Sequence, residues 1–272
     1  MSYASLMVAV DDGRNAARRV RLAAELAHRF GARLIGAAAC LPEYPQGFGE
    51  TIVPAGFAIE EIRRAALDRL AGSEEVFRQA SCLNDRVVWR SDLTGPVAFL
   101  ERQARGADLV VIGRPADDEG VSPGMAVGIG DALMGMGRPV LVVPPGLEHL
   151  EARRIVLGWK NTAQTRRATA DALPFLQRAE VVTVARVADG EDSPEIEDVV
   201  AYLALHNVNA TMQVTKTSGW SVAEGLLWTA RERDADLVVT GGYGYSRLRE
   251  WFFGGVTRDL LAQAPVCCLM SH

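Results

Sequence analysis

A glycine-rich stretch near the end of the chain has the composition of a phosphate-binding loop. From Thr240 to Leu260 it reads TGGYGYSRLREWFFGGVTRDL, a turn between a strand-like run and a helix-like run. Glycines let the backbone approach a bulky anion and adopt positive φ. Free N–H groups and the positive dipole end of the following helix then face the phosphate oxygens. The stretch contains Gly241, Gly244, Gly254 and Gly255, and Val256 and Thr257 follow the last glycine at the start of the helix-like run.

Catalytic signals are sparse by comparison. The four histidines are scattered and lack metal-ligand spacing: His28, His149, His206 and His272. The sequence has neither a G-x-S-x-G elbow nor a G-x-x-x-x-G-K-[ST] loop. The adjacent carboxylates Asp11 and Asp12 point to different sides of a strand end, so a solvated turn is the expected account. We therefore expect no catalytic residues, no metal held by protein ligands alone and at most weak ATPase activity.

The elements that position this loop occur twice in the chain. The segment ADLVVIG at Ala107–Gly113 returns as ADLVVTG at Ala235–Gly241, and a proline opens an apolar run near each end, at Pro139 and Pro265. Landmarks that repeat in the same order indicate duplication. We expect one domain over residues 1–146 and a second over 151–272, with a polar, turn-rich seam between them.

Within each copy, short apolar runs alternate with longer amphipathic stretches. Strands are expected at Leu6–Val10, Arg33–Cys40, Val87–Trp89, Leu109–Ile112 and Val140–Val143, then at Ile155–Trp159, Val181–Val187, Ala210–Thr215, Leu237–Thr240 and Val266–Met270. Helices are expected at Arg14–Phe30, Ile59–Gln79, Pro96–Arg105 and Ile129–Met136, then at Thr165–Gln177, Pro194–His206, Val222–Arg233 and Val256–Gln263, with Pro174 kinking or shortening its helix. The pattern predicts an α/β fold of two tandem, doubly wound domains, each with a five-stranded parallel sheet. Ligands of such sheets bind beyond the carboxyl ends of the strands.

The spacing within the glycine-rich stretch resembles the ATP-binding signature of the universal stress protein family. Gly241-x-x-Gly244 is followed by nine residues and then by Gly254-Gly255-Val256-Thr257. The flanking sequence is similar to the family throughout, and the resemblance covers nearly the whole chain as two copies. It implies an adenine nucleotide alpha hydrolase-like fold, the ribose and phosphates of ATP near Gly241, Gly244, Gly254, Gly255 and Val256, and Mg or Mn with the phosphates.

The second copy departs from the family pattern at two positions. Gly255 stands where the family usually has Ser or Thr, which removes a hydroxyl but keeps the backbone N–H, and Thr257 is a candidate substitute. Lys160 and Asn161 follow the first strand, where ATP-binding members carry Asp near the adenosine. Lysine cannot accept a hydrogen bond from a ribose hydroxyl, although it attracts phosphate.

The first copy shows the opposite pattern. Asp11 and Asp12 end its first strand, as in ATP binders, but Gly113 is followed by Arg-Pro-Ala without the second glycine. Acidic residues at 117–119 would repel phosphate, and Ile129 occupies the Ser/Thr position. We expect this copy not to bind nucleotide.

Bulk composition excludes several classes of protein. The chain has 272 residues, 49% hydrophobic and 23% charged, with a formal net charge of −5, which argues against a nucleic-acid binder. It shows no signal-peptide pattern and no apolar run long enough to span a bilayer. Three of its four cysteines lie in apolar strand-like runs as expected buried hydrophobes. A cytoplasmic protein with reduced thiols is expected.

These observations favour a stress-response or regulatory module that binds ATP in its second domain. The alternatives are a scaffold whose two sites are both degenerate, and a slow ATP hydrolase. Protein partners are unknown. The last strand of each copy is apolar and uncharged, and exposed apolar edges associate. Universal stress proteins commonly dimerise through this strand, so we expect an intramolecular pseudo-dimer, with a further homodimer possible. Trp220 is expected to serve in packing.

Overall fold

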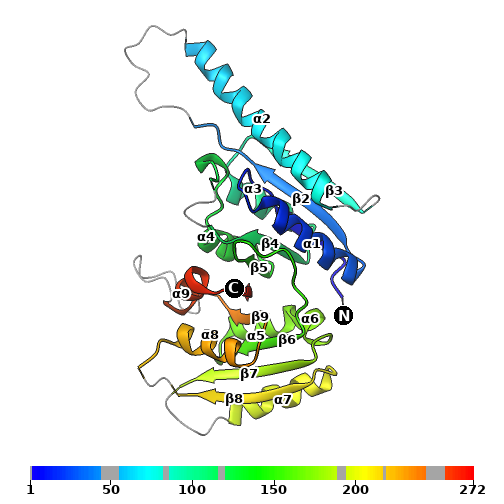
Figure 1. Ribbon diagram of the computed structural model, residues 1–272, viewed down its shortest axis with the longest axis vertical. Helices are drawn as coiled ribbons and strands as arrows, with labels where there is room; N and C mark the ends of the chain where they lie inside the picture. The colour runs from blue at the N-terminus through cyan, green and yellow to red at the C-terminus, as the bar shows by residue number, and fades with distance from the viewer. Residues whose placement is uncertain are drawn as a thin grey trace.

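The protein forms a single mixed sheet of 10 strands in the order β3-β2-β1-β4-β5-β10-β9-β6-β7-β8 (Figure 1). The computed structural model describes residues 2–43, 55–81, 86–115, 120–188, 194–216, 219–242 and 255–272. Each half of the sheet has the same strand order when read from the centre outwards. Within each half all neighbouring strands are parallel, as the alternation of strands and helices predicts.

The elements agree closely with the hydrophobic periodicity. In the first half they are β1 (Ser5–Ala9), α1 (Ala16–Phe30), β2 (Arg33–Ala39), α2 (Ala55–Ser81), β3 (Val87–Asp92), α3 (Pro96–Ala104), β4 (Leu109–Gly113), the 3₁₀ turn η1 (Pro123–Met125), α4 (Ile129–Gly135) and β5 (Val140–Val143). In the second half they are β6 (Arg154–Gly158), α5 (Ala163–Asp171), α6 (Leu173–Leu176), β7 (Val181–Val187), α7 (Pro194–Leu205), β8 (Ala210–Thr215), α8 (Val222–Glu232), β9 (Leu237–Gly241), α9 (Gly255–Gln263) and β10 (Cys267–Ser271).

Two local features depend on proline. The helix expected at Thr165–Gln177 is divided into α5 and α6 at Ala172, immediately before Leu173 and Pro174. Proline lacks an N–H and its ring clashes with the preceding turn, so the predicted interruption is confirmed. The turn η1 was not expected from the sequence. It begins at Pro123, which supplies the fixed φ of a first helical residue.

The two halves join through an antiparallel pairing of their last strands. Cys268 lies opposite Val142, Leu269 opposite Leu141 and Met270 opposite Val140. The expected pairing of the two apolar edges within one chain is therefore present. This pairing reverses the strand direction. The carboxyl ends of the first-half strands therefore lie on the same side of the sheet as the amino ends of the second-half strands.

Apolar side chains cover both faces of the sheet in layers that continue across this junction. One layer contains Leu109 and Leu141 from the first half together with Leu237 and Leu269 from the second. The other layer likewise runs through Val142 and Cys268 into the second half. Joining the edge strands removes any boundary between the cores of the two halves, which therefore share their hydrophobic layers.

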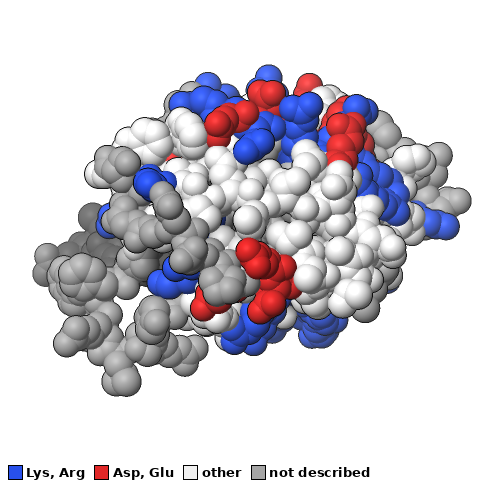
Figure 2. Space-filling model, turned by 90° about the horizontal axis from the view of Figure 1, so that it is seen from below, with Lys and Arg blue, Asp and Glu red and all other residues white. Residues whose placement is uncertain are grey.

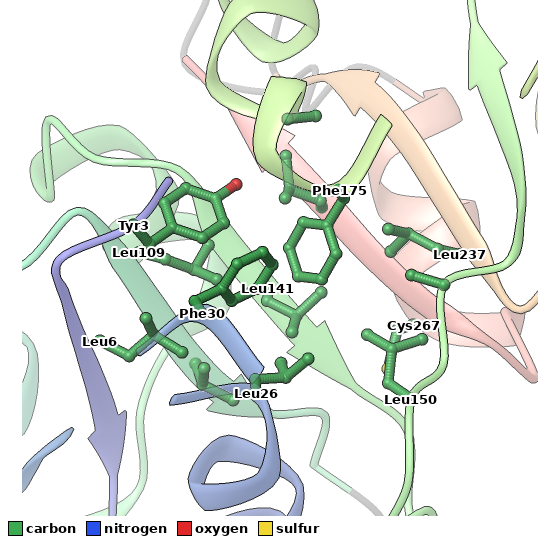
Figure 3. Packing of buried hydrophobic residues seen from close by; sticks show 14 of the residues in the cluster. Tyr3, Leu6, Leu26, Phe30, Leu109, Leu141, Leu150, Phe175, Leu237 and Cys267 are labelled. Atoms are coloured by element: carbon green, nitrogen blue, oxygen red, sulfur yellow. The ribbon is translucent and has the colours of Figure 1, made fainter. Parts of the chain in front are cut away.

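Three aromatic rings close the junction on one face of the sheet (Figure 3). Tyr3, Phe30 and Phe175 contact one another edge to face, with centroid distances of 5.0 Å for Tyr3–Phe30, 5.6 Å for Tyr3–Phe175 and 5.1 Å for Phe30–Phe175. The Tyr3 hydroxyl donates a 2.6 Å hydrogen bond to the carbonyl of Asp171. Such pairs add stabilisation beyond their buried area. Burial raises the pKa of Tyr3 well above its ordinary value.

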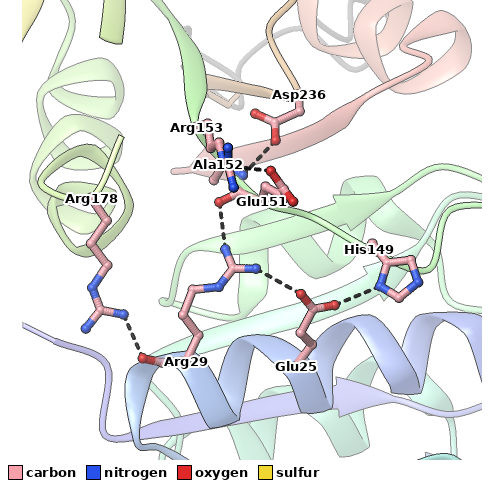
Figure 4. Close-up of polar contacts among 8 residues, drawn as sticks. All are labelled: Glu25, Arg29, His149, Glu151, Ala152, Arg153, Arg178 and Asp236. Atoms are coloured by element: carbon pink, nitrogen blue, oxygen red, sulfur yellow. Dashed lines mark hydrogen bonds and ion pairs between the residues drawn. The ribbon is translucent and has the colours of Figure 1, made fainter. Parts of the chain in front are cut away.

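The connecting segment between the halves is held against helix α1 by polar contacts (Figure 4). Arg29 donates to the carbonyl of Glu151 at 2.6 Å and to the Glu25 carboxylate at 3.1 Å. The other Glu25 oxygen lies 2.9 Å from Nδ1 of His149, and this hydrogen bond raises the pKa of His149. Arg178, beyond α6, donates to the Arg29 carbonyl at 2.8 Å. The seam is therefore fixed in place.

The strand β8 forms an open edge of the sheet at the end of the molecule seen in Figure 2, where uncharged atoms cover a broad band. Met212 on this strand is 55% exposed, and Leu205 at the end of α7 is 84% exposed. Trp220 is 44% exposed and its ring centroid lies 5.7 Å from that of Trp228. Trp220 therefore packs against a neighbouring ring at the surface, just before α8, and does not enter the core.

The cysteine environments match the sequence expectation. Cys40, Cys267 and Cys268 are buried free thiols, and Cys82 lies outside the described residues. Burial raises the pKa of Cys268 to about 12. Within the described part of the chain, no helix has the length and apolar character needed to cross a membrane.

The junction predicts a large difference between two matched lysine substitutions. Val142 is 3% exposed and lies opposite Cys268 in the β5–β10 pair, so Val142→Lys buries a charge without a partner. We expect a loss of about 3–5 kcal/mol in the free energy of unfolding. Met212→Lys on the open β8 edge should change it by less than about 0.5 kcal/mol. Urea unfolding followed by circular dichroism measures both, and equal losses would contradict a buried junction.

Candidate functional site

The strand order reverses between β6 and β9 in the second half, and the region beyond their carboxyl ends, called the crevice, is where doubly wound sheets bind ligands. Gly158 and Trp159 leave β6 at this point, and Gly241 and Gly242 leave β9. The glycine-rich stretch therefore begins where this class of sheet binds ligands. Gly244 and Gly254 fall outside the described residues, as do the arginines and aromatic residues between them.

Gly241 lets the end of β9 approach the beginning of α5. A Cβ at this position would lie 2.6 Å from the backbone nitrogen of Thr165 and 2.8 Å from the carbonyl carbon of Gln164. No side chain fits there without moving backbone atoms. Thr162 caps α5 by accepting a 3.2 Å hydrogen bond from the same Thr165 N–H. Gly241 is thus required for packing, in addition to any role with a ligand.

The first turn of α9 presents backbone to the surface. Gly255 is exposed, Val256 is half-buried and Thr257 is 4% exposed. A Cβ added to Gly255 would have its nearest neighbour, the Oδ2 atom of Asp259, at 3.8 Å, and its φ is not in the left-handed range. A ligand approaching from solvent would therefore meet Gly255 and Val256 before the buried hydroxyl of Thr257.

The end of β6 is polar and basic. Lys160 is exposed, and Asn161 accepts a 2.6 Å hydrogen bond from Arg166 on α5. The indole nitrogen of Trp159 is buried without a hydrogen-bond partner. Lys160 and Arg166 supply positive charge beside the carboxyl end of β6, next to Gly241 at the end of β9.

The end of β10 closes the crevice beside Gly242, which sequence reasoning did not foresee. The Gly242 N–H donates to the Ser271 carbonyl at 2.8 Å, and Nδ1 of His272 lies 3.3 Å from the Gly242 carbonyl oxygen. The Ser271 hydroxyl donates to Asp171 at 2.8 Å. Burial raises the pKa of Asp171, while this hydrogen bond and two nearby arginines act in the opposite direction. The apolar strand pattern of β10 gave no signal for these polar contacts.

An ion pair occupies the equivalent crevice of the first half. Arg19, 2% exposed, places Nη2 2.6 Å from Oδ2 of Asp11 and donates from Nε to the Ala9 carbonyl at 2.9 Å. Asp11 also accepts a 3.0 Å bond from the Gly13 N–H. A Cβ on Gly113 would lie 2.0 Å from Arg19 Nη1, so the glycine makes room for the guanidinium. The expected solvated turn is wrong for Asp11, because Arg19, eight residues along the chain on α1, forms a buried ion pair with it.

The turn η1 fills the rest of the first crevice. Gly124 accepts a 2.8 Å bond from the Leu41 N–H, and Met125 is 1% exposed in a cluster with Cys40 and Leu70. Asp12 accepts a 2.9 Å bond from the Ser122 N–H. The cavity left between the strand ends, η1 and α3 has a volume of about 10 Å³, room for a single water.

The second half differs from the first at the residues that fill the crevice. The residue of α5 at the same distance beyond the strand end as Arg19 is Ala168, and the residue equivalent to Asp11 is Lys160. Ala168 cannot form such an ion pair. Among the described residues, no group of three His, Cys, Asp or Glu side chains could hold a metal ion.

A doubled, doubly wound α/β fold with a crevice at each strand-order reversal defines the adenine nucleotide alpha hydrolase-like class. Residues 151–272 match the model of the Universal stress protein family. No curated protein matches the chain in sequence. A universal stress protein from Archaeoglobus fulgidus DSM 4304 has a similar structure, with a TM-score of 0.67 and 12% identity over 98% of this chain and 95% of that protein.

A protein of unknown function from Pseudomonas aeruginosa PAO1 is also similar, with a TM-score of 0.56 and 14% identity over 99% of this chain and 92% of that protein. At these identities the structures establish the fold. Residues 151–272 match the universal stress protein family model, and nearly the whole chain has the fold of the universal stress protein from Archaeoglobus fulgidus.

The filled first crevice can be tested through its ion pair. Arg19→Met leaves Asp11, 16% exposed, without its partner, so we expect a loss of about 3–5 kcal/mol in unfolding free energy. The double variant Asp11→Asn/Arg19→Met removes both charges and should recover most of this loss. Urea denaturation measures each variant. A double variant as unstable as the single one would show that the pair is not the reason for Arg19 at this site.

Proposed function

We propose that the second half binds one adenine nucleotide, ATP, and that the protein is a cytoplasmic stress-response or regulatory module without rapid turnover. The observation that carries this proposal is the position of the glycine motif. Gly241 lies at the strand-order reversal, and Gly255 opens a helix of 9 residues whose first turn is accessible. Both belong to the half that matches the family model. The cytoplasmic location is supported by the buried, free thiols.

The start of a helix beside glycine-rich backbone supports a phosphate group as the ligand. Helix α9 directs its first N–H groups and the positive end of its dipole toward the crevice. At the β6 end, where ATP-binding members of the family carry aspartate, Lys160 adds a cation that attracts phosphate. A bound Mg²⁺ or Mn²⁺ would neutralise the phosphates, and Asp259 could supply a carboxylate ligand beside Gly255.

The filled first crevice supports a stoichiometry of one nucleotide per chain. With the Arg19–Asp11 ion pair and Met125 buried here, the remaining cavity of about 10 Å³ is too small for a nucleotide. We expected the first half not to bind nucleotide because its loop lacks the second glycine. The filled crevice is a second physical reason for that expectation. Calorimetric titration with ATP and Mg²⁺ should give a stoichiometry near one, and a release assay for phosphate should show slow or no turnover.

A single charge in the loop should abolish this binding. Gly244→Asp adds bulk and a negative charge where the family motif brings backbone to phosphate, so we expect no ATP binding measurable by calorimetry. Gly95→Asp is the matched control. Gly95 caps α3 in the first half with open space around it, and aspartate is favourable at that position. ATP binding that survives Gly244→Asp would refute the proposed site.

Restoring the hydroxyl at Gly255 should tighten binding. Serine fits there, because the nearest atom to its Cβ is 3.8 Å away and the backbone is unstrained. We expect Gly255→Ser to improve ATP affinity by roughly 0.5–1.5 kcal/mol, the net contribution of one hydrogen bond. Gly255→Ala, which adds the Cβ alone, is the control for the hydroxyl. Equal affinities of the two variants would place the phosphate away from residue 255.

A further inference from the structure

Arg114 of the first half stands at the position that Gly242 occupies in the second. Each directly follows the last glycine of its strand, Gly113 or Gly241. The Arg114 N–H donates to the Val143 carbonyl at 2.8 Å, just as the Gly242 N–H donates to Ser271 at 2.8 Å. The backbone is thus equivalent in the two halves, and the first half alone has a side chain at this position.

The Arg114 side chain crosses the junction to the end of helix α9. Its Nη1 atom donates a 2.8 Å hydrogen bond to the carbonyl oxygen of Ala264. Ala264 follows the last residue of α9, and its own N–H bonds to Leu260 in the final turn. The last carbonyls of a helix lack intrahelical partners. Ala264 is 3% exposed, so Arg114 satisfies a carbonyl with little access to water and places a cation at the negative end of the helix dipole.

The antiparallel junction explains how a first-half loop reaches this point. The carboxyl ends of the first-half strands lie at the same end of the molecule as the amino ends of the second-half strands. Helix α9 runs from the carboxyl end of β9 back to the amino end of β10, so its last turn ends beside the loop after β4. The same helix begins at Gly255, on the proposed phosphate site.

We propose that Arg114 is a positioning residue for nucleotide binding, acting from the first half on the phosphate-binding helix of the second. Helix α9 has 9 residues, about 13 Å of rigid helix, so fixing its last turn also fixes the direction of its first N–H groups. Leu260 anchors the middle of the helix in the core. This inference rests on the proposed function of the second half.

The test compares Arg114→Ala, Arg114→Lys and the control Arg90→Ala. Arg90 is also half-buried and donates a 2.8 Å bond, but to Gln103 within the first half. Two quantities are measured: ATP affinity by calorimetry, and amide hydrogen exchange of residues 255–263 in the protein without ligand. We expect Arg114→Ala to weaken ATP binding about three- to tenfold, consistent with the loss of one hydrogen bond. The exchange of α9 amides should quicken.

Arg114→Lys retains the cation at the helix end and should recover part of both effects, and Arg90→Ala should change neither. A merely structural contact would lower overall stability without a selective change at α9. Wild-type affinity in Arg114→Ala, or unchanged α9 exchange, would overturn the inference and leave the proposed function standing. Failure of the wild-type protein to bind ATP would instead overturn the proposed function, and this inference with it.

Discussion

Two short apolar strands, β5 and β10, face each other across the centre of the molecule, and the remaining architecture follows from their pairing. Each would otherwise be an exposed edge with unpaired backbone groups and apolar side chains on both faces. Their antiparallel contact merges two five-stranded sheets into one and makes the hydrophobic layers continuous. The aromatic contacts of Tyr3, Phe30 and Phe175 and the contacts of Arg29 with the connecting segment then hold the halves in one orientation.

The two crevices have the same backbone topology but differ in the side chains that line them. In the first half, burial of the Arg19–Asp11 pair stabilises the strand ends internally, and η1 packs over them. A buried ion pair is favourable only when its remaining hydrogen bonds are satisfied, and the Ala9 carbonyl and Gly13 N–H provide them. In the second half, Ala168 and Gly241 leave the corresponding position without a buried charge. The difference is electrostatic, because the folds of the halves are alike.

The sequence predicted the elements well because local periodicity and proline determine them. Every expected strand is present, and Pro174 interrupts its helix as predicted. The pairing of the last strands was predictable from their apolar, uncharged composition. Features that depend on how the strands are assembled were not. Arg19 lies within an expected helix, Arg114 follows Gly113, and Pro123–Met125 was assigned to no element; the contacts of all three are visible only in the structure. At the candidate site, the glycines were visible as a motif, whereas the packing of Gly241 on α5 required the structure.

The covalent link between the halves has a consequence for how such a protein can diverge. In a homodimer with two-fold symmetry, every substitution appears twice, so an arginine that fills one crevice fills both. A single chain removes this restriction. Arg19 and Arg114 each occur in one half, with Ala168 and Gly242 as their counterparts, and neither choice is imposed on the other half. The two halves of a fused chain can therefore acquire different roles, whereas the two identical subunits of a symmetric dimer cannot.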